Sequence, residues 1–376
     1  YLGESCMSYV TEEARKAVKV PLLNAGTHNP DTALELLESG NVDLVMMGRA
    51  LIADPELPNK LMEGRREDVR PCLRCNENCI GRIWNRHTKL GCSINVQAME
   101  EERFRLEKTD SPKEVVVIGG GPGGMEAARV AALIGHKVTL LERSEKLGGV
   151  MGEICTAKFK KNIKELTKWY LVQLQKLGVD VRLNTTATAD DPLLETCDRI
   201  IIGCGAVPVV PPIPGIDGKN VISILDAHRD PKLIKGDHIA VCGGGASGCD
   251  GALEIAEEMG KKVTIIEMLR ECAKDAMFIN KISLFNALNR NHVEMLTDTK
   301  VVSVQADGLT LEKKDGTLET LKADTVITAF GMKPDLTTVD AIKAKYHTKT
   351  RVVGDSNKPG KIGDAVRDGF YAASSL

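Results

Sequence analysis

The sequence predicts an α/β protein built around two Rossmann-like dinucleotide-binding units. Each unit shows three features in order: an apolar run typical of a buried strand, a Gly-rich turn that opens a helical stretch, and an acid about twenty residues further on. The first fingerprint consists of Gly119, Gly121, Gly123, Gly124 and Glu142, and the second of Gly243, Gly245, Gly248 and Glu267. One Gly-x-Gly-x-x-Gly alone is weak evidence, but two in full context predict two bound nucleotides.

Both fingerprints have a physical basis in nucleotide binding. Glycine lets the backbone approach a pyrophosphate, and the following helix directs its N-terminal amides at the phosphate charge. Glu142 and Glu267 can each accept hydrogen bonds from an adenosine ribose. Glu267 favours NADH at the second site because its carboxylate would repel a 2′-phosphate, although Arg270 is close enough in sequence to keep NADPH open. The alternative interpretation, two Gly-rich turns without ligands, is disfavoured by the presence of two complete copies.

Four cysteines upstream of the first fingerprint have the spacing of a metal-binding loop. They read Cys72-x2-Cys75-x3-Cys79, and Cys92 follows. Thiolates in this pattern suit tetrahedral zinc or an iron–sulfur cluster, and the spacing alone does not separate the two. The neighbouring redox nucleotides favour a [4Fe–4S] cluster, because it carries electrons whereas zinc is redox-silent. The other seven cysteines form no Cys-x-x-Cys pair, so they are interpreted as small buried hydrophobes.

Composition indicates a cytoplasmic enzyme that acts on a small-molecule substrate. The formal net charge is −2 without a polybasic block, so neither nucleic acid nor an anionic membrane is an expected partner. Aromatic residues make up only 3% of the chain, which argues against a base-stacking surface. Eleven cysteines in 376 residues are too few for a disulfide scaffold, and no signal peptide or long apolar segment is present. The oligomeric state stays open, a homo-oligomer included.

The first seventy residues are predicted to form two βα units rather than a complete domain. Residues 20–26 and 42–48 are expected strands, residues 31–39 have a helical period, and another helix is expected after Pro55. Two such units cannot close a barrel and the chain begins at Tyr1, so we expect a larger N-terminal portion to precede it. In a parallel barrel the loops after the last two strands bind phosphate, and those positions hold Ala25, Gly26, Gly48 and Arg49. Arg49 either donates two hydrogen bonds to a phosphate through its guanidinium or is an ordinary arginine in a surface turn.

Several motifs, taken in order, resemble one known family. They are Gly48-Arg49 through Asp54-Pro55, Arg70-Pro71-Cys72-x2-Cys75-x3-Cys79, Cys92-Ser-Ile-Asn95 and the first Gly-rich fingerprint. This series is similar to that of the multidomain NADH:flavin oxidoreductases, typified by bacterial 2,4-dienoyl-CoA reductase, 2-enoate reductase and trimethylamine dehydrogenase. The resemblance covers the whole chain.

The resemblance implies a set of cofactors and their sites. It implies that the first segment is the end of an FMN-binding TIM barrel, that the four cysteines hold [4Fe–4S], and that the two fingerprints bind FAD and NADH. Residues implied to border FAD are Gly149, Lys160, Ala187, Asp355 and Ile362. Two positions depart from the family pattern near the expected FAD: Cys204 stands where a threonine is usual, and Val150 where a glutamine is frequent. The resemblance places the catalytic residues in the barrel portion, outside this sequence.

The expected architecture is nested. Residues 1–66 are the C-terminal part of the barrel, residues 67–112 the iron–sulfur segment and linker, and residues 113–215 with 323–376 a Rossmann-like FAD domain. A Rossmann-like NAD(H) domain, residues 216–322, is expected as an insertion. The strand-like run from Ala323 to Gly331 is assigned to the FAD domain.

The implied activity is electron transfer from NADH through FAD and [4Fe–4S] to FMN, with reduction of an activated C=C bond in an enoate, enoyl-CoA or enone. One alternative is an amine or other dehydrogenase that runs in the oxidative direction. Another is an electron-transfer or nucleotide-binding subunit whose partner supplies the chemistry. The complete second fingerprint favours the reductive direction.

Overall fold

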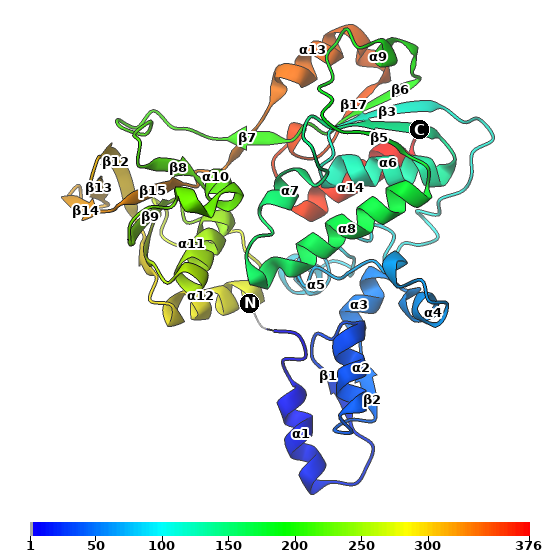
Figure 1. The fold of residues 1–376 in the computed structure, drawn as a ribbon, viewed down its shortest axis with the longest axis horizontal. Helices are drawn as coiled ribbons and strands as arrows, with labels where there is room; N and C mark the ends of the chain where they lie inside the picture. Colours follow the sequence, from blue (N-terminus) through cyan, green and yellow to red (C-terminus); the bar gives the residue numbers. More distant parts are fainter. Residues whose placement is uncertain (1–2) are drawn as a thin grey trace.

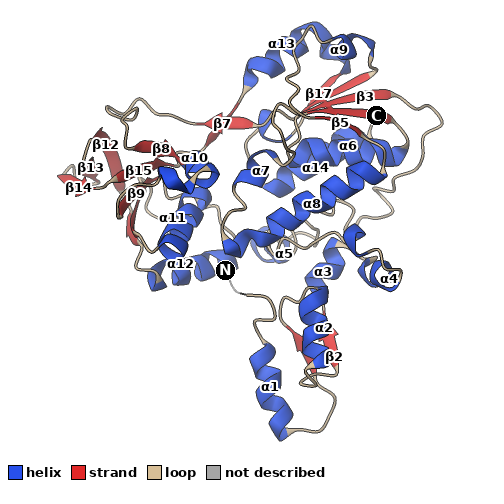
Figure 2. Ribbon diagram, viewed as in Figure 1, coloured by secondary structure: helices blue, strands red, loops and turns tan. Residues whose placement is uncertain are grey.

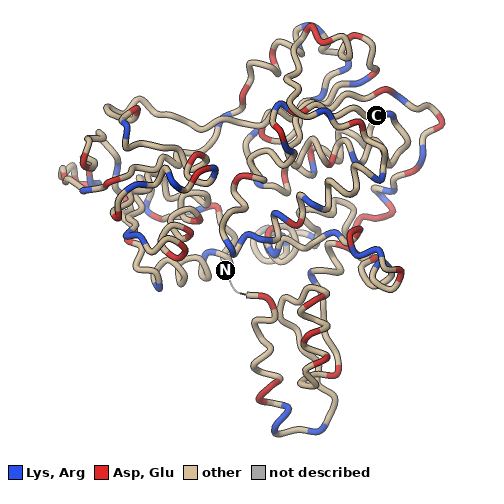
Figure 3. Tube along the Cα trace, in the orientation of Figure 1, with Lys and Arg blue, Asp and Glu red and all other residues tan. Residues whose placement is uncertain are grey.

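The computed structural model describes residues 3–376 (Figure 1). Tyr1 and Leu2, with which the expected barrel segment begins, lie outside the described residues. The chain forms an N-terminal βα segment, an irregular cysteine segment and two Rossmann-like units, so the predicted α/β class is confirmed (Figure 2). Within the described range, no helix combines the length and apolarity needed to cross a lipid bilayer. Basic and acidic residues are interspersed along the trace (Figure 3).

The N-terminal segment contains the expected βα units. Residues 8–46 extend away from the two Rossmann-like units, whereas Ala53 packs into the core of the first unit (Figure 1). The two strands of the segment pair in parallel, with Leu23 opposite Leu44. A helix already begins at Gly48, directly after the second strand, so Gly48 and Arg49 form its first turn rather than an open loop. The elements are α1 (Ser8–Ala17), β1 (Leu23–Ala25), α2 (Pro30–Glu38), β2 (Leu44–Met46), α3 (Gly48–Ala53) and α4 (Leu57–Met62).

The cysteine segment has little regular structure. It contains the short 3-10 helix η1 (Arg66–Asp68) and helix α5 (Ile80–Arg86). The loop between Arg70 and Cys79 connects these two helices and contains no strand. Side chains of neighbouring elements bond some of its backbone groups.

The first Rossmann-like unit is a five-stranded parallel sheet in the order β17-β6-β3-β4-β5. Its central strand is buried on both faces: Val115 and Val117 pack into the core under α6, α8 and α14, while Val116 and Ile118 pack toward α9 and α13. The strands are β3 (Glu114–Ile118), β4 (Lys137–Leu141), β5 (Asp180–Arg182), β6 (Arg199–Ile202) and β17 (Thr350–Val352). The helices are α6 (Pro122–Ile134), α7 (Gly149–Glu153), α8 (Lys161–Lys176), α9 (Pro192–Thr196), α13 (Leu336–Tyr346) and α14 (Ile362–Ser374), with the 3-10 turns η2 (Lys158–Lys160), η4 (His347–Lys349) and η5 (Gly354–Ser356).

The second unit is a five-stranded parallel sheet in the order β11-β10-β9-β15-β8. Its strand β9 turns Ile239 and Val241 toward helices and turns Ala240 and Cys242 toward a three-stranded antiparallel sheet. The strands are β8 (Val221–Ser223), β9 (His238–Cys242), β10 (Lys262–Ile266), β11 (Glu294–Leu296) and β15 (Thr325–Thr328), and the antiparallel sheet is β12 (Thr299–Gln305), β13 (Gly308–Lys313) and β14 (Leu318–Lys322). The helices are α10 (Ile224–Arg229), α11 (Ala246–Met259) and α12 (Phe278–Arg290), with the 3-10 turn η3 (Pro231–Leu233).

The expected domain boundary at residues 322/323 is wrong. Strand β15 lies inside the second sheet, where Val326 pairs with Ala240 of β9 on one side and Val221 of β8 on the other. The chain crosses back only through β16 (Met332–Pro334), which pairs antiparallel with β7 (Ala206–Pro208). The apolar run in β15 could complete either sheet, because burial on both faces gives the same sequence pattern in both units.

Candidate nucleotide-binding and cysteine sites

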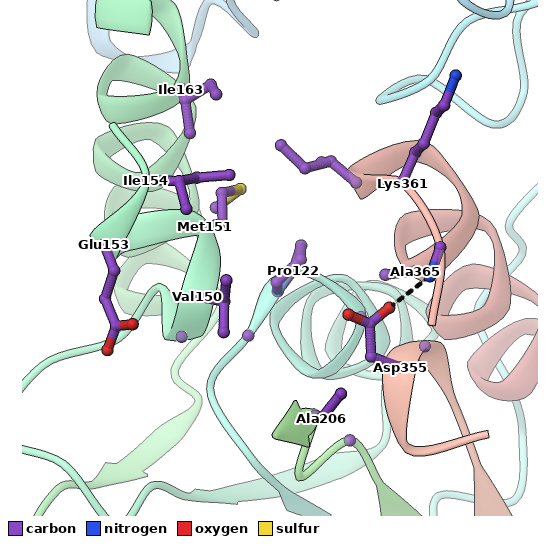
Figure 4. Close-up of a pocket in the computed structure, with 18 of the residues that line it drawn as sticks. Pro122, Val150, Met151, Glu153, Ile154, Ile163, Ala206, Asp355, Lys361 and Ala365 are labelled. Carbon is purple, nitrogen blue, oxygen red and sulfur yellow. Dashed lines mark hydrogen bonds between the residues drawn. The ribbon is translucent and has the colours of Figure 1, made fainter. Parts of the chain in front are cut away.

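A cavity of about 750 Å³ lies between the two Rossmann-like units, at the carboxyl ends of β3, β4 and β6. This is where an open parallel sheet places its ligand. The residues of the first fingerprint and its expected neighbours that line the cavity are Gly119, Gly121, Gly123, Glu142, Gly149, Lys160, Ala187, Asp355 and Ile362. The departures from the family pattern, Cys204 and Val150, also line it. In Figure 4, Val150, Met151 and Ile163 face Asp355, Lys361 and Ala365 across the space, with Pro122 between them.

Two glycines of the first turn have different physical roles. A Cβ on Gly124 would lie 1.9 Å from the carbonyl oxygen of Gly119, so this position permits the close packing of helix on strand. A Cβ on Gly121 would meet no protein atom within 4 Å and would project into open space. Gly121 therefore leaves room for a ligand to approach the backbone, whereas Gly124, which does not line the cavity, serves the fold.

Glu142 braces the first Gly-rich turn. Its Oε2 accepts a hydrogen bond from the N–H of Gly120 at 2.6 Å, and its Oε1 accepts from the N–H and the hydroxyl of Ser144 at 2.8 and 2.7 Å. Each carboxylate oxygen has further lone pairs, so the acid can still accept from a ribose hydroxyl.

The second Gly-rich turn repeats this geometry with a more open surface. Glu267 Oε2 accepts from the N–H of Gly244 at 2.7 Å, and Oε1 accepts from the N–H of Leu269 at 2.8 Å. The fingerprint residues Gly243, Gly245, Gly248 and Glu267 do not line the large cavity. The next residues, Ala246 and Ser247 at the N-terminus of α11, do line it and are exposed.

Polar groups from both units meet across the cavity. Lys160, which ends η2 of the first unit, forms an ion pair with Asp250 of α11 in the second unit. Asp355 accepts a hydrogen bond from the N–H of Gly360 at 3.0 Å, and burial raises the pKa of its carboxyl group. Burial also raises the pKa of the Cys204 thiol to about 11, so this thiol is neutral at pH 7.

All four cysteines of the metal-like motif line one small cavity beside the large one. None of the four is in a disulfide. Burial raises the pKa of Cys72 to about 11 and that of Cys75 to about 12, and Cys75 Sγ donates to the hydroxyl of Ser93 at 3.3 Å. In the described part of the chain, no three His, Cys, Asp or Glu side chains are arranged to hold a metal ion. The four thiols thus surround a space without converging on one point.

The two cavities share a wall. Four residues line both of them: Leu73, Cys75, Asn78 and Ser93. A single layer of residues, which includes Cys75, therefore separates the two cavities.

The loop that carries Cys72 and Cys75 is held by amide side chains from both units. Asn162 of α8 donates to the carbonyl of Cys72 at 2.7 Å, and Asn280 of α12 donates to the carbonyl of Cys75 at 2.7 Å. Asn76 donates to Asn280 Oδ1 at 2.8 Å. Sequence reasoning missed these asparagines because no motif or spacing marks residues that meet across ninety or two hundred positions.

Arg49 points toward the cysteine loop. Its Nη1 donates to Asn76 Oδ1 at 2.6 Å and its Nη2 donates to the hydroxyl of Thr27 at 2.8 Å. Both partners are neutral, so no carboxylate balances the guanidinium in these contacts. Arg49 lines the small cavity, whereas Ala25, Gly26 and Gly48 line neither cavity.

Comparisons with known proteins agree with this geometry. The family model for pyridine nucleotide-disulphide oxidoreductases matches residues 89–193 and 193–359, and that for the NADH:flavin oxidoreductase / NADH oxidase family matches residues 4–68. The chain is 35% identical to bilirubin reductase of Mediterraneibacter gnavus, over 98% of the chain and 57% of that protein. It is 32% identical to cinnamate reductase of Clostridium sporogenes, over 97% of the chain and 54% of that protein.

A solved structure shares the architecture. The structure of a 2-naphthoyl-CoA reductase with 2-naphthoyl-CoA superposes with a TM-score of 0.93 at 30% identity, over 99% of this chain and 57% of that one. The chain thus spans a little more than half the length of these relatives.

Proposed function

We propose that this chain, which belongs to the multidomain NADH:flavin oxidoreductase family, carries electrons from NADH through FAD and a [4Fe–4S] cluster to FMN. The electrons would reduce an activated C=C bond. When bound, these groups supply hydride acceptance at FAD, one-electron transfer at the cluster and substrate reduction at FMN. An enoate, enoyl-CoA or enone is the substrate class. The chain's own residues hold and separate these groups.

The observation that carries the proposal is the shared wall of the two cavities. Leu73, Cys75, Asn78 and Ser93 contact both spaces. A flavin ring at this end of the large cavity and a cluster in the small one would be separated by one layer of residues. This arrangement supports electron transfer between them better than it supports a structural zinc.

The large cavity fits a dinucleotide of FAD size. The pyrophosphate would lie at the N-terminus of α6 beside Gly121, where open space meets unpaired helix amides. Glu142 would accept from the adenosine ribose, and Ala187 also lines the cavity. The apolar side chains of Met151 and Ile163 would cover the flavin and exclude water from it.

The second turn fits an exchangeable NADH. The N-terminus of α11 is exposed at Ala246 and Ser247, which border the cavity from the other unit. A nicotinamide bound across this edge would reach the flavin position without entering the first turn. The complete second fingerprint favours NADH as the electron donor, which supports the reductive direction over an amine dehydrogenase.

The cysteine pocket fits a cluster by its chemistry. Four unbridged thiols on one cavity provide the soft ligands that iron–sulfur clusters require, and binding would have to displace their protons. The hydroxyl of Ser93 lies within hydrogen-bond reach of Cys75 Sγ, a type of contact that tunes cluster potentials.

Anaerobic titration with NADH tests the proposal. We expect the purified protein to be yellow-brown, to contain iron and acid-labile sulfide, and to bleach at the flavin absorbance when NADH is added. C75S should lose the iron, since one iron would lack its soft ligand, while FAD binding persists. One zinc per chain and no iron would overturn the cluster, and an unchanged flavin spectrum would favour a nucleotide-binding subunit.

A further inference from the structure

We propose that Arg74 binds the flavin: its guanidinium donates a hydrogen bond through Nη1 to an acceptor on the ring end of the FAD that the large cavity would hold. This inference rests on the proposed function, because it assigns a residue to the proposed FAD. Arg74 belongs to neither Gly-rich fingerprint and lies between two cysteines of the metal-like motif.

The backbone and side chain of Arg74 are both held in place. Its φ of +56° is in the left-handed region that residues with a Cβ rarely adopt, and its N–H donates to Cys72 Sγ at 3.4 Å. Its Nη2 donates to Asn162 Oδ1 at 3.2 Å, while the Nδ2 of the same asparagine donates to the Cys72 carbonyl. Asn162 therefore fixes the loop and the arginine together.

The second terminal nitrogen of the guanidinium, Nη1, is buried and has no hydrogen-bond acceptor among the described residues. Arg74 also lines the large cavity. A buried charged donor without an acceptor is one of the costlier arrangements in a fold, so an acceptor from a ligand in that cavity would relieve it. One terminal nitrogen of Arg74 is thus bonded to protein, and the other is buried without a protein acceptor in a residue that borders the cavity, an arrangement that a ligand acceptor would complete.

The position of Arg74 along the cavity selects the flavin ring. A pyrophosphate at Gly121 and an adenosine ribose at Glu142 would fix one half of FAD. The other half must then lie along the rest of the cavity wall, which includes Leu73, Arg74 and Asn162. Leu73 and Cys75, the two chain neighbours of Arg74, belong to the wall that the large cavity shares with the small one.

A fixed cation at the ring has a chemical consequence. The pyrimidine part of a flavin carries carbonyl oxygens that accept hydrogen bonds, and it gains negative charge when the ring is reduced. A guanidinium beside it therefore stabilises the reduced ring more than the oxidised ring and raises the flavin midpoint potential. Arg74 thus acts as a positioning residue that also favours uptake of electrons from NADH.

The test compares R74Q and R74K with R82Q in the FAD-loaded protein. Arg82 belongs to the same cysteine segment, but it bonds Thr88 and lines neither cavity, so R82Q is the matched control. The readouts are the FAD dissociation constant, the flavin midpoint potential and the iron content. R74Q should weaken FAD binding about tenfold and lower the potential, with iron retained. R74K should retain most of the potential, because the charge remains, but weaken FAD binding several-fold, because one ammonium cannot serve both Asn162 and the ring.

Several outcomes would overturn the assignment. Unchanged FAD affinity and potential in R74Q would do so, and so would loss of iron with FAD binding intact, since Arg74 would then only brace the cysteine loop. If R74Q does not fold, R74K decides: FAD affinity equal to that of the unaltered protein rejects the inference. If loss of Arg74 weakens NADH binding but not FAD binding, the acceptor is the nicotinamide nucleotide and the assignment is wrong. Failure of the unaltered protein to bind FAD would instead reject the proposed function.

Discussion

The two Gly-rich turns share their hydrogen bonds but differ in what covers them. In each turn the second glycine donates its N–H to the acid that ends the next strand: Gly120 to Glu142 at 2.6 Å, and Gly244 to Glu267 at 2.7 Å. The first turn is covered by α14, which packs so closely on α6 that a Cβ on Gly369 would lie 2.1 Å from the carbonyl oxygen of Gly123. Among the described residues no helix covers the second turn in this way, and Gly245 to Ser247 are exposed.

The difference in cover suggests a physical way for one motif to suit both a nucleotide that stays bound and one that exchanges. Both turns present a helix N-terminus to a phosphate, so the local attraction is similar. Enclosure of a turn slows dissociation of its bound nucleotide, whereas an exposed turn lets the nucleotide exchange in each catalytic cycle. The covered turn therefore suits a resident FAD and the open turn suits NADH, which must enter and leave.

The largest expected effect comes from the glycines that pack helix on strand. A Cβ on Gly124 would lie 1.9 Å from the Gly119 oxygen, and a Cβ on Gly248 would lie 1.9 Å from the Gly243 oxygen. G124A and G248A should each lower the free energy of unfolding by roughly 3 kcal/mol or more, because the backbone must move. Denaturant titration followed by circular dichroism measures this.

A control glycine makes that result specific. In α7, a Cβ on Gly152 would meet only the carbonyl oxygen of Leu147 at 3.8 Å, an ordinary contact. G152A should leave stability unchanged or raise it slightly, since alanine favours a helix. If G124A and G152A unfold alike, the packing role assigned to Gly124 is wrong.

The next effect distinguishes FAD binding at the first turn from NADH binding at the second. Gly121 and Gly245 have φ of −74° and −65°, which alanine adopts freely, and a Cβ at either position meets no protein atom within 4 Å. G121A should fold normally yet bind FAD about tenfold to a hundredfold more weakly, with NADH binding retained. G245A should do the reverse. Equilibrium titration of each variant with both nucleotides checks this, and equal loss of both ligands from either variant would contradict two separate sites.

A smaller effect is expected from the acids that brace the turns. Each carboxylate accepts a backbone N–H on both oxygens, from Gly120 and Ser144 at Glu142, and from Gly244 and Leu269 at Glu267. The amide of glutamine would turn an N–H₂ toward one of these donors. E142Q and E267Q should each therefore cost about 1–3 kcal/mol of stability in the absence of nucleotide.

Glu145 provides the control for the acids. Its side chain is exposed, so E145Q should change the free energy of unfolding by less than about 0.5 kcal/mol. If thermal or denaturant unfolding of E142Q matches that of E145Q, the acid serves the ligand alone and does not brace the turn.

The comparison also shows which features a sequence can reveal. Turns, their acids and the clustered cysteines are local patterns set by spacing along the chain, and the structure brings Gly119, Gly121 and Glu142 to one cavity. The sequence pattern places strand β15 in the wrong sheet, because a strand buried on both faces has the same apolar pattern in either unit. No sequence pattern marks Arg74, Asn162 or Asn280, because their contacts depend on tertiary placement and follow no spacing along the chain.

The smallest expected effect concerns the choice between NADH and NADPH at the open turn. Both oxygens of the Glu267 carboxylate accept from the backbone N–H groups of Gly244 and Leu269, so a 2′-phosphate on the ribose would meet an acidic group beside the exposed residues 268–270. E267Q should raise the NADPH-to-NADH ratio of flavin reduction rates by about tenfold at low salt and by less at high salt. Arg270 is exposed three residues on, and R270Q should shift the ratio the other way. Stopped-flow reduction with each nucleotide measures both ratios. A ratio that E267Q leaves unchanged while R270Q lowers it would show that the arginine alone sets the choice, and that Glu267 serves only to hold the turn.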